Sequence, residues 1–142
     1  MVTKDITTTI TVETKVTAPV EKVWKYWTLP EHISQWYQSS PEWYVPFADN
    51  NPEVNGKFKI TMATKDNKVR VDLEGVYTQI HEFKKIEYTF KDGRIVRVAF
   101  LSQGNITKII EIFETGNFHP PDLQRADRQA ILDNFKEYTE SK

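Results

Sequence analysis

Residues 121–138 read PDLQRADRQAILDNFKEY, and this stretch decides the fold. Pro121 has the backbone angle that the first turn of a helix needs, and Asp122 places a negative charge where the helix dipole favours one. A mostly apolar stripe follows at helical spacing: Leu123, Ala130, Ile131, Asn134, Phe135 and Tyr138. The sequence therefore predicts one long amphipathic helix at the C-terminal end.

Most of the chain before this helix predicts antiparallel strands. Apolar and polar residues alternate from Ile6 to Val16, which is typical of a half-buried strand. Five more segments of this kind lie at residues 57–62, 69–77, 86–90, 95–100 and 106–113. Asp92-Gly93 predicts a type I′ hairpin turn between two of them. We expect six or seven strands in meander order, with the C-terminal helix lying across the sheet.

Two short helices are expected after the first strand. Pro19 suits the first helical position, and Val20, Val23, Trp24 and Trp27 follow at helical spacing. Pro30 ends this helix, and residues 31–37 predict a second one with Ile33, Trp36 and Tyr37 on one side.

Residues 42–56 predict an aromatic loop. Pro46 and Pro52 exclude a central strand, although a short strand near Trp43 stays open. The loop also carries Tyr44 and Phe47, so its aromatic side chains are either pinned to the core or border a binding site. We favour pinning, because an ordered loop must bury something.

Composition narrows the function classes. The chain has 142 residues, which suits a single domain over residues 1–142, and it has no Cys, which excludes disulfides and thiolate chemistry. Its net charge of −1 gives no electrostatic attraction to nucleic acid or to an anionic membrane. There is no run of about 18 apolar residues and no apolar leader. We therefore expect a cytoplasmic protein, either a monomer or a weak dimer.

Several motifs together resemble a known family. These are LPEHISQW at 29–36, Trp43-x-x-Pro46, NGKF at 55–58, LEGVY at 73–77, IEYT at 86–89, DGR at 92–94 and AILDNFK-x-Y at 130–138. Their order resembles the START-like superfamily, also called SRPBCC or Bet v-like. Within it, the chain resembles the bacterial branch named after the activator of heat shock protein 90 ATPase. The resemblance implies an α+β helix-grip fold, in which a curved antiparallel sheet wraps the C-terminal helix around an apolar cavity.

The resemblance also implies which side chains face the helix. On the middle strands these are Phe58, Ile60, Met62, Val71, Leu73, Tyr77, Tyr88, Phe90, Val96, Val98 and Phe100. On the helix we expect Leu123, Ile131 and Phe135 to face the sheet. Either face of the strand at residues 106–113 could point to the helix, and the family pattern favours the face that carries Glu111. A buried carboxylate needs a partner, so a Glu111 that faces water stays open as the alternative.

This chain departs from the family at two places. Trp43-Tyr44-Val45-Pro46 stands where relatives often have Trp-His-Cys-Pro, and Asp127-Arg128 stands where they typically have Gly-Trp. We hypothesise that Arg128 lies at the mouth of the cavity, where it could pair with Glu111 or receive an anionic ligand group. In the alternative, Arg128 extends to solvent.

No catalytic or metal-binding constellation is recognisable. His32, His81 and His119 lie far apart in the sequence, and no nucleophile or phosphate-loop motif occurs. For His32 we favour a structural hydrogen bond over contact with a ligand. No cofactor is expected.

The favoured function is binding of a small apolar or aromatic molecule between sheet and C-terminal helix. The predicted ligand-binding residues are Trp36, Trp43, Tyr44, Phe58, Ile60, Met62, Leu73, Tyr88, Val98, Phe100, Glu111, Arg128 and Ile131. Two alternatives remain: a protein-interaction domain with a chaperone partner, and an enzyme of the cyclase/aromatase kind.

Overall fold

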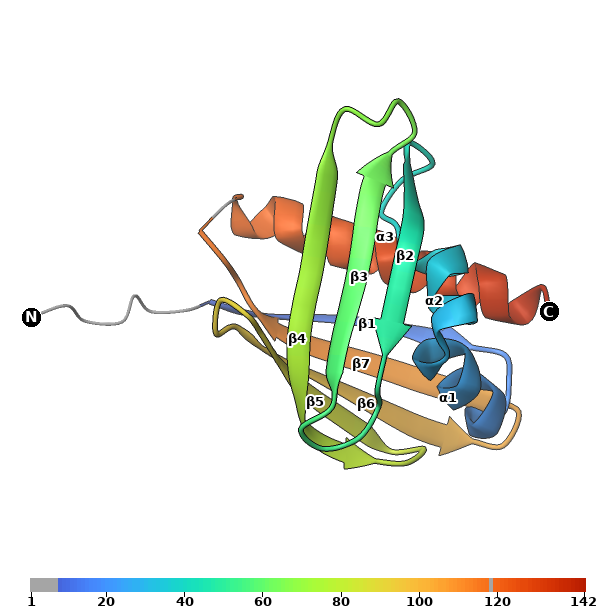
Figure 1. The fold of residues 1–142 in the computed structure, drawn as a ribbon. Helices are drawn as coiled ribbons and strands as arrows, with labels where there is room; N and C mark the ends of the chain where they lie inside the picture. The colour runs from blue at the N-terminus through green and yellow to red at the C-terminus, as the bar shows by residue number, and fades with distance from the viewer. Residues whose placement is uncertain (1–7, 118) are drawn as a thin grey trace, which may run out of the picture.

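The computed structural model describes residues 8–117 and 119–142, so Ile6 lies outside the described residues. Its elements, in chain order, are β1 (Thr9–Val16), α1 (Val20–Thr28), α2 (Pro30–Trp36), β2 (Trp43–Asn50), β3 (Lys57–Thr64), β4 (Arg70–His81), β5 (Lys85–Phe90), β6 (Ile95–Gln103), β7 (Ile106–Glu114) and α3 (Pro121–Glu140). The seven strands form one antiparallel sheet in the order β1-β7-β6-β5-β4-β3-β2. The sheet curves, and α3 lies across it (Figure 1). The predicted α+β helix-grip fold is confirmed.

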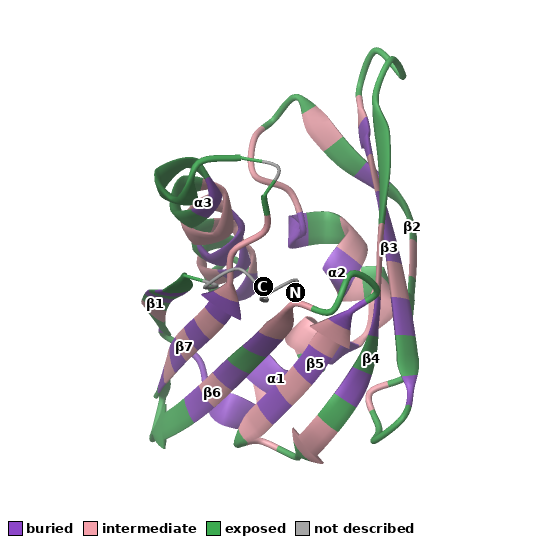
Figure 2. Ribbon diagram, turned by 90° about the vertical axis from the view of Figure 1, so that its left-hand side faces the viewer, coloured by how far each residue is buried: buried purple, intermediate pink, exposed green. Residues whose placement is uncertain are grey.

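The order of the strands explains where the helices lie. Strands β2 to β7 pair consecutively, and β1 then joins the far side of β7, with Val12 opposite Glu111. The chain between β1 and β2 must therefore cross from one edge of the sheet to the other. It does so as α1 and α2, which close the open side of the curved sheet together with α3 (Figure 2).

An aromatic cluster fixes the helices to the sheet. The Phe135 side chain of α3 is fully buried, and its ring lies 5.0 Å from that of Trp27 and 4.8 Å from that of Trp36. The Trp27 ring lies 5.5 Å from the ring of Phe100 on β6. Most of these contacts are edge-to-face, which is the favoured geometry for aromatic pairs. One cluster thus connects all three helices with the sheet.

The structure shows which face of strand β7 points into the core. Thr107, Ile109, Glu111 and Phe113 are buried, whereas the alternate residues are only partly buried or exposed. The inward orientation of Glu111, implied by the family resemblance, is confirmed.

The N-terminal turn of α3 differs from the prediction. Leu123 does not face the sheet, because its side chain is 45% exposed. The buried residue is its neighbour Gln124, which accepts a hydrogen bond from Gly116 N and donates to the carbonyls of Gly116 and His119. The loop before the helix needs these polar contacts, so an amide occupies the position that an apolar side chain was expected to fill.

Residues 43–50 form the edge strand β2, so the strand near Trp43 that the sequence left open is present within the expected loop. An edge strand tolerates Pro46 because one of its sides needs no hydrogen bonds. One strand-level prediction is wrong. Val71 is 41% exposed instead of facing the helix. It lies near the end of the β3–β4 hairpin, which extends past the helices (Figure 1).

The Asp92-Gly93 turn forms a hairpin of another type than expected. Gly93 has a φ of 95°, but Asp92 is not among the residues with positive φ, so the type I′ turn, which needs both, is absent here. The Gly93 amide donates to Phe90 O, and the Phe90 amide donates to Arg94 O. The loop of residues 91–93 is therefore one residue longer than the two-residue turn that the sequence suggested.

The longest helix is α3, with 20 residues. None of the helices in the described ranges is both long and apolar enough to cross a membrane.

Gly75 allows the closest approach within the sheet, and we predict that Gly75→Ala is destabilising. A Cβ there would lie 2.5 Å from Cε2 and Cζ of Phe58 and 2.8 Å from the carbonyl oxygen of Thr89. Overpacking of this kind costs about 1–3 kcal/mol of the free energy of unfolding, measurable by urea denaturation. Val76→Ala, on the more exposed face of β4, serves as the control. A loss at Gly75 no larger than that of the control would contradict the close approach.

Candidate functional site

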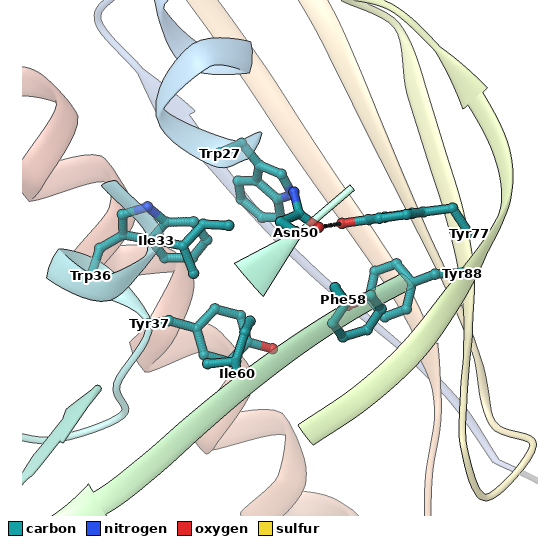
Figure 3. A pocket seen from close by; sticks show the side chains of 9 residues that line it. All are labelled: Trp27, Ile33, Trp36, Tyr37, Asn50, Phe58, Ile60, Tyr77 and Tyr88. Atoms are coloured by element: carbon teal, nitrogen blue, oxygen red, sulfur yellow. Dashed lines mark hydrogen bonds between the residues drawn. The ribbon is translucent and has the colours of Figure 1, made fainter. Parts of the chain in front are cut away.

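A small cavity lies between the first two helices and the sheet (Figure 3). It is lined by Trp27, Ile33, Trp36, Tyr37, Asn50, Phe58, Ile60, Tyr77 and Tyr88. Its volume is about 30 Å³, which is room for about two water molecules. Sites for small molecules measure about 300–1,000 Å³. None of the lining residues comes from α3, so the cavity lies beside α2 and not between sheet and C-terminal helix as expected.

The cavity has one wall formed by the sheet and one formed by helices. One wall is the sheet, where Phe58 and Ile60 of β3 project beside Tyr88 of β5 (Figure 3). The Phe58 and Tyr88 rings lie 5.0 Å apart in an edge-to-face contact. The opposite wall consists of the apolar sides of α1 and α2. Strand pairing on both sides holds the sheet wall in place, whereas side-chain packing holds the helical wall.

Asn50 joins the two walls. Its side-chain oxygen accepts a hydrogen bond from the hydroxyl of Tyr77 (Figure 3), and its side-chain nitrogen donates to Thr28 O at 2.7 Å. Asn50 thereby ties the end of β2 to both β4 and the last residue of α1. Burial raises the pKa of the Tyr77 hydroxyl, so this group stays protonated and donates.

A buried ion pair lies between α3 and the sheet. Arg128 Nε and Nη2 donate to the two carboxylate oxygens of Glu111 at 2.8 and 2.9 Å. The side chains of Arg128 and Glu111 are only 15% and 2% exposed. Burial acts to lower the pKa of Arg128, but the Glu111 carboxylate together with the phenols of Tyr37 and Tyr88 outweighs it and raises that pKa well above its ordinary value. The pairing alternative is thus confirmed, and Arg128 does not extend to solvent.

The same guanidinium also contacts the cavity wall. Arg128 Nη1 donates to the hydroxyl oxygen of Tyr37 at 2.6 Å. Tyr37 follows directly after α2 and lines the cavity. The guanidinium of Arg128 therefore connects α3 with β7, through Glu111, and with the end of α2, through Tyr37.

His32 has the structural role that was predicted. Its Nδ1 lies 2.6 Å from the hydroxyl of Tyr138 on α3, and its ring stacks on that of Tyr26 at 4.1 Å. Burial lowers its pKa. The side chain does not line the cavity.

The predicted ligand-binding residues fall into three groups. Four line the cavity: Trp36, Phe58, Ile60 and Tyr88. Seven do not line it: Val98, Phe100 and Ile131 are buried in the core, Met62 and Leu73 pack against the core, and Glu111 pairs with Arg128. The last two, Trp43 and Tyr44, lie on β2 away from the cavity.

Tyr44 lies on the outer face of the sheet. It is 37% exposed, and its hydroxyl donates to Asn67 at 2.9 Å. It lies opposite Ala63, whose side chain points away from the face that carries Ile60 and Met62. In this structure Tyr44 is therefore no part of the cavity.

Five lining residues were not predicted as ligand-binding: Trp27, Ile33, Tyr37, Asn50 and Tyr77. Trp27, Ile33 and Tyr37 could have been predicted, because they belong to the apolar sides of the two short helical segments. Tyr77 could have been predicted from the alternation of apolar and polar residues along β4. Asn50 offered no signal, because its sequence surroundings are typical of a turn.

Comparisons with known proteins agree with this geometry. A family model described as "Activator of Hsp90 ATPase homolog 1-like protein" matches residues 17–140. The AHSA1-like protein from Aeromonas hydrophila is 33% identical, with a TM-score of 0.88 over 94% of this chain and 93% of that one. A solved protein from Cytophaga hutchinsonii is 49% identical, with a TM-score of 0.80 over 93% and 92% of the two chains. A protein from Chromobacterium violaceum, 17% identical, shares the fold with a TM-score of 0.84 over 94% of this chain and 98% of that one. A search of curated proteins gave no match.

We predict that Glu111→Gln is strongly destabilising, because it leaves a buried guanidinium without a matching charge. The expected loss in the free energy of unfolding is about 3–5 kcal/mol, measured by urea denaturation. Replacing both partners, as Glu111→Leu with Arg128→Met, should recover much of it.

A matched control is available on the neighbouring strand. Glu13 of β1 is 55% exposed and pairs with Lys108 of β7 at 3.6 Å. Glu13→Gln should cost less than about 1 kcal/mol, as exposed pairs do. Equal losses from the two substitutions would show that the buried pair has no special role.

Proposed function

This chain belongs to the family of Activator of Hsp90 ATPase homolog 1-like proteins, and from that premise we propose that it binds a small molecule with an apolar or aromatic body. The observation that supports the proposal is the cavity between α2 and the sheet. Its lining combines aromatic rings with a few polar groups, as sites for small molecules generally do.

Binding requires that the cavity opens, because about 30 Å³ does not admit an aromatic molecule. We propose that α2 is the wall that moves. It has only seven residues and no side-chain hydrogen bond at its N-terminal cap. Beyond its C-terminal end, two contacts with α3 retain the segment: Tyr37 accepts from Arg128, and Gln38 O accepts from Asn134. The sheet wall has no such freedom, because both neighbours of β4 are paired to it.

A chaperone partner is the second candidate. The description of the family names an activator of a chaperone ATPase. The observation that favours a protein partner is a pair of aromatic side chains on the outer face of edge strand β2, Tyr44 at 37% and Phe47 at 47% exposure. Exposed aromatic groups beside a sheet edge are typical of protein-binding surfaces.

We predict that 2-acetylnaphthalene binds in this cavity and raises the melting temperature, because it binds only the native state. In an NMR titration, the amide shifts should concentrate in α2 and in β3 to β5. Ile33→Trp fills the cavity and should abolish the shifts. Val69→Trp, at a residue that is 46% exposed, is the control and should leave them unchanged. Shifts that persist in Ile33→Trp would place the molecule elsewhere and refute the proposal.

The chaperone candidate predicts a different pattern. The pure protein should stimulate the ATPase of an Hsp90-class chaperone, and Tyr44→Ser with Phe47→Ser should remove the stimulation, while Ile33→Trp should retain it. An ATPase rate that is the same with and without the protein would eliminate this candidate.

A further inference from the structure

Two phenol hydroxyls at the cavity, those of Tyr37 and Tyr88, have no acceptor among the described residues. Tyr88 is only 7% exposed and lines the cavity, yet its hydroxyl has no hydrogen-bond partner within the described ranges 8–117 and 119–142. Tyr37 accepts a hydrogen bond from Arg128, but its own proton has no acceptor among those same residues. Of the other polar side chains of the lining, Tyr77 and Asn50 are bonded to each other, and the indole Nε1 of Trp36 donates to Tyr26 O at 3.0 Å.

Both hydroxyls are suited to donate. Burial, followed by the nearby Tyr37 phenol, raises the pKa of Tyr88 well above its ordinary value, so Tyr88 keeps its proton. The oxygen of Tyr37 already accepts from a guanidinium, and hydrogen bonds in a chain polarise one another. The proton of Tyr37 is therefore a better donor than that of an isolated phenol.

The charge at this end of the cavity is already balanced. The Arg128 guanidinium faces the Glu111 carboxylate in a two-point contact, with one charge of each sign. A ligand carboxylate would add a second negative charge beside Glu111 in a buried place, which is unfavourable. An uncharged oxygen acceptor meets no such repulsion.

We propose that the hydroxyls of Tyr37 and Tyr88 together bind an uncharged carbonyl oxygen on an otherwise apolar or aromatic ligand. This assignment rests on the proposed binding function and names the chemical class of the ligand. The aromatic rings of the lining contact the body of the molecule, and the two phenols select a ketone, aldehyde, ester or amide over a hydrocarbon of the same shape.

The test compares three probes of similar shape by NMR titration of the intact chain: 2-acetylnaphthalene, 2-ethylnaphthalene and 2-naphthoate. The ketone should bind about five- to thirtyfold more tightly than the hydrocarbon, which is the range of one or two net hydrogen bonds. The carboxylate should bind more weakly than the ketone.

Tyr→Phe variants show which hydroxyl is responsible for the preference for the ketone. Tyr88→Phe should remove most of the preference for the ketone and leave binding of 2-ethylnaphthalene unchanged. Tyr44→Phe loses a hydroxyl on the outer face. This control should keep the preference. Urea denaturation of each variant checks that it is folded.

The outcomes separate the two proposals. If ketone and hydrocarbon bind equally to the wild-type cavity, the carbonyl site is refuted and the binding function stands. If 2-naphthoate binds most tightly, the ligand is an anion and the carbonyl assignment is wrong. If no probe binds and the protein as purified holds no small molecule by native mass spectrometry, the binding function fails, and the carbonyl site fails with it.

Discussion

The pairing of Glu111 with Arg128 is the constraint around which the molecule is arranged. An isolated charge could not remain in so buried a place, so the carboxylate of β7 and the guanidinium of α3 each require the other at hydrogen-bonding distance. Buried pairs contribute little net stability but are costly to break. The pair therefore determines where α3 lies along the sheet.

The position of the cavity follows from this arrangement. The third donor of the Arg128 fork retains Tyr37 and so anchors the end of α2. Aromatic packing around Phe135 fills the space beneath α3, and the cavity lies beside α2, a helix of seven residues. In the binding function that we propose, α2 moves away from the sheet, and the phenols of the lining receive a molecule that brings an acceptor.

Much of the fold was predictable because its signals are local. Alternation marked six of the seven strands of the sheet, all but β2, and helical spacing marked all three helices. The predictions that were wrong concern residues whose environment depends on distant parts of the chain. Val71 has an inward pattern but lies where no helix covers it, and Leu123 lost its place to Gln124 because a neighbouring loop needed an amide. Pro46 excluded a central strand correctly, but the sequence did not reveal that its strand lies at an edge.

The sequence by itself determined the order of the elements, the antiparallel sheet with its C-terminal helix and the family resemblance, because periodicity and turn residues act over a few neighbouring positions. Only the tertiary structure decided which polar groups meet. Glu111 and Arg128 are 17 residues apart, and Arg128 and Tyr37 are 91 apart, so their contacts depend on how α2, α3 and β7 pack. The volume of the cavity also depends on the tertiary packing. The cavity is the space that remains after side chains from four strands and two helices have packed. No local sequence pattern specifies how large that space is.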